Sequence, residues 1–180
     1  MIEKILDLDS YLFLFLNNLG SQYYDNFWIF LSRTEANVMV YLVVLIAYIY
    51  SINNKRRTKI LFHLIIAIAI LITISDQTSN LFKDSFQRLR PCYNELISDS
   101  LRLVKDSCGG RYGFFSAHAS NSFSLAIFFG LLLRSSNKLS ILLFAIYAFL
   151  ISYSRIYLGV HYPIDIIVGI IFGTINAIVL

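Results

Sequence analysis

Long uncharged apolar blocks constrain the fold of this 180-residue chain more than any other feature. They cover residues 36–52, 60–75, 112–133, 139–154 and 166–180, and the first third of the third block reads as a Gly- and Ser-rich loop entering a helix. A transmembrane helix needs roughly 20 apolar residues, fewer when flanking side chains reach the interface. Charged residues make up only 14% of the chain, against about 25% in soluble proteins. We therefore expect an all-α polytopic membrane bundle of five transmembrane helices, forming one domain over residues 1–180.

The N-terminal segment, residues 1–33, is apolar but interrupted by polar residues such as Asp7, Asp9 and Asn17. This pattern predicts an amphipathic helix in the membrane interface, with a sixth, short span as the alternative. The acidic residues Glu3, Asp7 and Asp9 stand where a cleavable signal peptide would be basic, so we do not expect this segment to be one.

The loops predict the topology. Residues 53–59 and 134–138 are short and basic, which is typical of cytoplasmic loops beside anionic lipid. The net charge of +4 therefore indicates a membrane and not nucleic acid. The loops at 81–117 and 155–163 would then face the other side, and they hold nearly all the residues capable of catalysis.

The first of these loops contains a pair of cations. Lys83 and Arg90 are seven residues apart, so we expect both on one face of a helix that Pro91 ends. Two cations at a membrane surface suit a phosphate group, because Arg offers a planar fork and Lys a point charge. Taken alone, the pair would also fit two side chains that snorkel to the interface at a helix end. Asp76 is expected to pair with Lys83 or with another helix.

Two histidines follow. Ser116 is a candidate N-cap, which places His118 in the first turn of a helix, where free N–H groups attract an anion. Asp165 comes four residues after His161, and Pro163 between them fits a helix start. A carboxylate that accepts the Nδ1–H of His161 would leave Nε2 as a nucleophile. Arg155 adds a third cation on the same side.

These residues are similar in order and spacing to the three-part signature of the type 2 phosphatidic acid phosphatase superfamily. The three parts are Lys83-x6-Arg90-Pro91, then Ser116-x-His118, then Ser154-Arg155-x5-His161-x3-Asp165. The resemblance covers about residues 81–165 and the helices around them. Phe115 stands where that family usually has proline, and Ala117 replaces the commoner glycine.

The resemblance implies a metal-independent, cofactor-free phosphatase that works through a phosphohistidine. It assigns His161 as the nucleophile, Asp165 as the residue that orients it, and His118 as the acid that protonates the leaving oxygen and then activates water. Lys83, Arg90 and Arg155 would hold the phosphoryl oxygens, aided by Ser116.

A protein with so little mass outside the membrane suits a phosphorylated membrane lipid as substrate, and no obligate protein partner is expected. The resemblance places it in the bacterial inner membrane, with its active site facing the periplasm. Arg102, Lys105 and Arg111 would suit a multiply anionic headgroup, which favours lipid A. Undecaprenyl diphosphate and phosphatidylglycerophosphate are the alternative substrates, and a non-catalytic transporter or lipid-binding protein is the more distant alternative.

The two cysteines bracket the loop between the first two motifs. Cys92 follows Arg90-Pro91, and Cys108 opens the glycine stretch before Ser116. In an oxidising periplasm such a pair tends to form a disulfide. The alternative is two free thiols in a polar loop.

Overall fold

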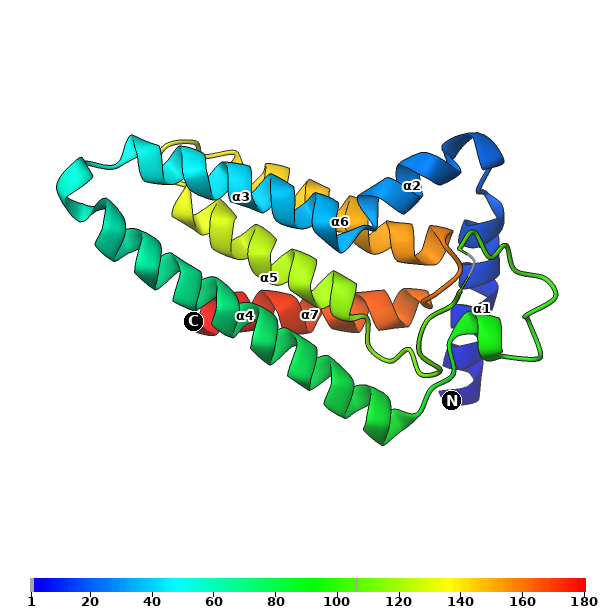
Figure 1. The fold of residues 1–180 in the computed structure, drawn as a ribbon. Coiled ribbons are helices and arrows are strands. Elements are labelled where there is room, and N and C mark those ends of the chain that lie inside the picture. The colour runs from blue at the N-terminus through cyan, green and yellow to red at the C-terminus, as the bar shows by residue number, and fades with distance from the viewer. Residues whose placement is uncertain (1, 106) are drawn as a thin grey trace.

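The computed structural model describes residues 2–105 and 107–180, and the regular structure in these residues is helical (Figure 1). The α-helices are α1 (Ile2–Asn18), α2 (Asp25–Leu31), α3 (Thr34–Ser51), α4 (Arg57–Phe86), α5 (Ala117–Leu132), α6 (Ser140–Tyr157) and α7 (Pro163–Val179). Short 3₁₀ turns lie at Gln22–Tyr24, Asn54–Arg56 and Pro91–Tyr93. The predicted all-helical membrane bundle is confirmed.

The five apolar blocks form α3 to α7, which run side by side as a bundle with α5 packed against α4, α6 and α7 (Figure 1). The helical segments Thr34–Ser51, Asn54–Phe86 and Ser140–Tyr157 are long and apolar enough to cross a membrane. Helices α5 and α7 are apolar but shorter, at 16 and 17 residues. The chain is thus a multi-pass membrane protein, and the count of five spans stays a prediction.

Small residues bring α5 and α7 into backbone contact. A Cβ atom added at Gly169 of α7 would lie 2.7 Å from the carbonyl oxygen of Ser116, and Gly173 leaves no more room beside Ser120. Small residues at a helix interface allow this close approach inside a membrane. The contact matters because α5 carries His118 and α7 carries Asp165.

Helix α1 crosses one end of the bundle, next to the long loop between α4 and α5 (Figure 1). Its Asp9, Phe13 and Asn17 recur every four residues and form a buried stripe. Asn17 fastens α1 to the end of α6, because its Nδ2 donates to the carbonyl oxygens of Ile156 and Tyr157 at 3.0 and 2.9 Å. The sequence predicted a single helix in this N-terminal segment, whereas the structure has two, α1 and α2, joined by the turn at Gln22–Tyr24.

The two basic connections, between α3 and α4 and between α5 and α6, lie at the end of the bundle opposite α1 (Figure 1). The long loop and the α6–α7 connection share the α1 end. This arrangement agrees with the predicted grouping of the loops on two sides.

Helix α4 extends 11 residues beyond the predicted apolar block and ends at Phe86. Gln87 follows in the left-handed conformation, with φ of 46°, and its N–H bonds the carbonyl oxygen of Lys83. The prediction that Lys83 and Arg90 share one helix face is therefore wrong, because the helix stops four residues before Arg90. The sequence offered no glycine here to signal the end.

Candidate active site

His161 and Asp165 form a buried pair at the start of α7. The Nδ1 atom of His161 lies 3.4 Å from Oδ2 of Asp165, and the two side chains are 3% and 0% exposed. The same carboxylate oxygen accepts the backbone N–H of Tyr162 at 3.1 Å, within a capping box in which Tyr162 is the N-cap and Pro163 the first residue of α7. Asp165 therefore stabilises the helix start, and as an acceptor beside Nδ1 it favours the imidazole tautomer that carries its proton there and keeps a lone pair on Nε2.

The surroundings of His161 keep the imidazole neutral. Burial, followed by the positive charges of Arg90, Arg155 and Lys83, holds the pKa of His161 well below its ordinary value. A cation is disfavoured both in a low-dielectric site and beside other cations. A neutral imidazole keeps the Nε2 lone pair that a nucleophile needs.

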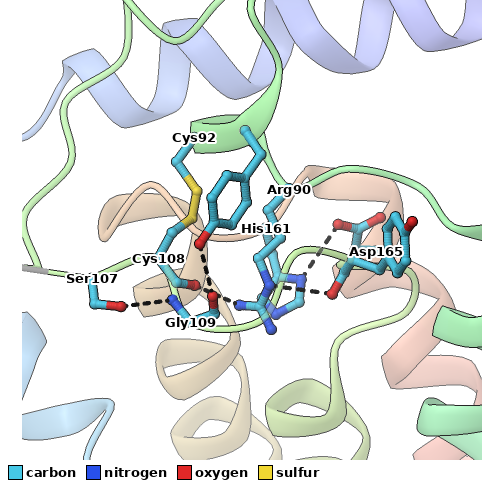
Figure 2. Close-up of a disulfide and its surroundings, with 9 residues drawn as sticks. Arg90, Cys92, Ser107, Cys108, Gly109, His161 and Asp165 are labelled. Carbon is cyan, nitrogen blue, oxygen red and sulfur yellow. Dashed lines mark hydrogen bonds and ion pairs between the residues drawn. A yellow bond between two sulfur atoms is a disulfide. The ribbon is translucent and has the colours of Figure 1, made fainter.

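Arg90 reaches the site from the loop, alongside His161 (Figure 2). Its Nη1 and Nε donate to the carbonyl oxygens of Cys108 and Tyr112 at 3.1 and 3.3 Å, and its backbone N–H donates to Arg111. Gly113 is needed beside it, because a Cβ atom there would lie 3.1 Å from Cγ of Arg90 and 3.2 Å from Oδ2 of Asp165. The loop between α4 and α5 therefore positions the Arg90 guanidinium, whereas the sequence predicted that a helix would do so.

His118 lies in the first turn of α5, as the sequence predicted. Ser116 is the N-cap, and its Oγ accepts the N–H of Ala119 at 3.4 Å. His118 is within electrostatic range of Arg155, His161 and Arg90, so the structure brings the two histidines and the cations to one place. The positive end of the α5 dipole adds to this field.

Two further cations complete the cluster. Arg155, at the end of α6, is 5% exposed, and its Nη1 donates to the hydroxyl of Ser32. Its Nε is buried and has no hydrogen-bond partner in the described part of the chain. Lys83 is half-buried near the end of α4, within electrostatic range of Arg90 and Arg155. Like charges held this close call for an anion between them.

The three residues expected at a headgroup differ in their placement. Nη2 of Arg102 contacts both carboxylate oxygens of Asp25, at 2.6 and 2.5 Å, so its predicted headgroup role is not supported: this guanidinium is already paired within the protein. Lys105 is half-buried on the loop, and burial together with the charges of Arg155 and Arg33 holds its pKa below the ordinary value. Arg111 is exposed on the loop.

Arg88 and Asp9 are site residues that the sequence reasoning missed. Arg88 donates from Nη1 to Oδ1 of Asp165 at 2.8 Å and from Nη2 to Oδ2 of Asp9 at 2.6 Å. Its guanidinium also lies over the Tyr162 ring, 4.1 Å from the centroid. Asp9 accepts the N–H of Ile164 at 2.9 Å as well. An unpartnered acid in an apolar N-terminal segment was the one available signal.

Cys92 and Cys108 form a disulfide in the structure, with Cα atoms 6.4 Å apart (Figure 2). Beside it, the hydroxyl of Tyr93 donates to the carbonyl oxygen of Gly109 at 3.0 Å. Because the carbonyl oxygen of Cys108 also accepts a hydrogen bond from Arg90, the disulfide holds part of the loop that positions this guanidinium.

Comparison with known proteins agrees with this site. Residues 64–180 match the PAP2 superfamily. The chain is 39% identical over 175 residues to a lipid A 4′-phosphatase of Bacteroides thetaiotaomicron, covering 96% of this chain and 75% of that protein. A lipid A 4′-phosphatase of Porphyromonas gingivalis is 34% identical, with 97% and 72% covered. The crystal structure of Aquifex aeolicus LpxE superposes with a TM-score of 0.68 at 24% identity, covering 93% of this chain and 91% of that one. This chain belongs to the PAP2 superfamily.

Proposed function

We propose that this protein is a lipid A 4′-phosphatase that hydrolyses a phosphate ester through a phosphohistidine. The observation that carries the proposal is the likeness to two lipid A 4′-phosphatases over nearly the whole chain, with the buried His161–Asp165 pair and its surrounding cations in place. Phosphoryl transfer depends mainly on positioning and on cations that stabilise the equatorial oxygens. Lys83, Arg90 and Arg155 supply the cations, and the His161–Asp165 pair supplies a positioned nucleophile.

In the first step, Nε2 of His161 attacks phosphorus while the bond from phosphorus to the lipid oxygen breaks. The Nδ1–H bonded to Asp165 stabilises the imidazolium character that develops. His118, whose protonated form is favoured once the anionic phosphate is bound among the cations, donates a proton to the leaving oxygen, which departs as the lipid hydroxyl. Lys83, Arg90 and Arg155 hold the three phosphoryl oxygens.

In the second step, the now neutral His118 takes a proton from water, and the resulting hydroxide attacks phosphorus. The bond between phosphorus and Nε2 breaks, phosphate leaves, and His161 returns to its neutral form. One residue thus acts first as acid and then as base, so the net reaction consumes one water.

The same proposal places the site at the periplasmic face of the inner membrane, with residues 87–116 as its main loop; the predicted loop 81–117 is shorter because α4 continues to Phe86 and α5 begins at Ala117. The predicted topology supports this placement because the basic connections lie at the opposite end of the bundle. The disulfide supports it too, since disulfides persist in oxidising compartments.

We also propose that α1 lies in the membrane interface. Leu8, Tyr11 and Phe15 on its outer side are 64%, 69% and 55% exposed, while its buried stripe contains Asp9 and Asn17. A helix with its polar side chains against the protein and its apolar side outward suits the boundary between headgroups and chains.

The test is phosphate release by the purified protein from lipid A, undecaprenyl diphosphate and phosphatidylglycerophosphate. We expect lipid A to be hydrolysed with the highest kcat/KM and the His161→Ala variant to be inactive on all three. Preference for another lipid by the wild-type protein would refute the substrate assignment, and full activity of the variant would refute the mechanism.

A further inference from the structure

A cavity of about 470 Å³ leads from the active site into the bundle between α3, α4 and α5. His118 lines one end of it, and Leu45, Leu125 and Phe129 line the part farther from the site. Its volume is within the range of roughly 300–1,000 Å³ found for small-molecule sites. Because the walls are mainly apolar and the cavity begins at His118, its fitting occupant is a hydrocarbon chain of the lipid whose phosphate lies at the catalytic site.

Two polar side chains interrupt this apolar lining. Asp76 of α4 and Asn121 of α5 both face the cavity, and Nδ2 of Asn121 donates to Oδ1 of Asp76 at 2.9 Å. Oδ1 of Asn121 is buried and has no hydrogen-bond partner among the described residues. A carboxylate and an amide oxygen are both acceptors, so this pair calls for a donor from a ligand. Polar side chains inside a membrane helix bundle cost free energy, and those that occur there commonly mark a binding or transport site.

The depth of the pair can be estimated from helix geometry. Asn121 is three residues beyond His118 on α5, which is about 4.5 Å along the axis, and Phe129 is about 16 Å beyond His118. Asp76 is seven residues before Lys83 on α4, or about 10 Å. The pair therefore lies between the phosphate-binding cations and the apolar depth, at the level where the chains of a bound lipid join its headgroup.

We propose that Asp76 and Asn121 form an acceptor site that binds N–H or O–H groups at the junction between headgroup and chains of the lipid substrate. This site selects lipids with amide-linked or hydroxylated chains, such as lipid A, over isoprenoid diphosphates and simple ester-linked lipids, which lack donors at that level. The inference rests on the proposed function. It adds that the protein also recognises the part of the lipid where the headgroup joins the chains, and not the phosphate alone.

The test compares Asn121→Leu and Asp76→Leu with the control Gln77→Leu, which makes the same kind of change at an exposed position of α4. The readout is kcat/KM on lipid A and on phosphatidic acid. We expect each cavity variant to lose about 10- to 100-fold on lipid A, as for loss of a hydrogen bond to a buried or charged group. Turnover of phosphatidic acid should change little, and the control should match the wild type on both lipids.

Equal losses on both lipids, or no loss on lipid A, would overturn the acceptor site. A binding measurement separates this result from failure of the proposed function. In the His161→Ala background, native mass spectrometry would compare retention of lipid A with that of phosphatidic acid, with and without Asn121→Leu. A selective loss of lipid A supports the site even if the wild-type protein proves to hydrolyse a different lipid, and an unselective loss overturns it.

Discussion

Replacing Arg88 tests most directly whether α1 is coupled to the catalytic His161–Asp165 pair. Arg88 lies between two buried carboxylates, with side chains of Asp9 and Asp165 that are 1% and 0% exposed, while its own is 18% exposed. In Arg88→Met the two acids would face each other without a cation. Breaking a buried pair costs about 3–5 kcal/mol. Taking about 3 kcal/mol because Arg88 is partly exposed, we expect Tm to fall by about 6–12 °C for a chain of this size.

The same variant should lower kcat about 100-fold, because a small displacement of Asp165 moves the imidazole that it orients. Removing the second acid as well, in Asp9→Asn/Arg88→Met, should recover about 1–3 kcal/mol of the lost stability. Tm is measured by intrinsic fluorescence in detergent and kcat by phosphate release, with exposed Arg134→Met, in the connection between α5 and α6, as the matched control. A Tm for Arg88→Met equal to that of the control, or a double variant whose losses simply add, would refute the coupling of α1 to the catalytic pair.

Four other predictions follow from the site. His118→Ala should fold with an unchanged helical circular dichroism spectrum yet lose phosphate release by orders of magnitude, and near wild-type turnover would remove its acid–base role. Activity should survive EDTA and be inhibited by vanadate, whereas loss on chelation that Mg²⁺ or Zn²⁺ restores would contradict a metal-free mechanism. Since burial and then the surrounding cations lower the pKa of His161, the acid limb of kcat/KM should lie below pH 6.5 and move to higher pH in Arg90→Gln, where the pKa rises; an unmoved limb would assign the titration to another group. Mass spectrometry of unreduced, alkylated protein should find Cys92 and Cys108 joined, and two alkylated thiols would contradict both the disulfide and the topology.

Much of this architecture could be predicted because membrane helices leave a local signal. Each apolar block became one helix, Ser116 caps α5, and Pro163 starts α7. The four-residue spacing of His161 and Asp165 was also informative, although His161 precedes α7: the capping box at Tyr162 turns the Asp165 carboxylate back toward the residues before the helix.

The remaining features depend on contacts that are distant in sequence. Arg88 was one of several basic residues in a polar stretch, and its partner Asp9 is 79 positions away. Arg102 was assigned to the substrate because Asp25, 77 positions away, gave no sign of being its partner. The end of α4 was missed because Gln87, and not glycine, adopts the left-handed conformation.

The backbone contact between α5 and α7 has a mechanical consequence. Residues Gly169 and Gly173 hold these helices at a separation that side chains cannot adjust, directly below His118 and Asp165. Helix α3, by contrast, has only Tyr41 and Leu45 buried. We therefore expect a bulky lipid that enters between α3 and α4 to displace α3 before it changes the spacing of the catalytic atoms. If the proposed function holds, one rigid catalytic geometry on α5 and α7 would then serve lipids with different numbers of chains, because the adjustment takes place at α3.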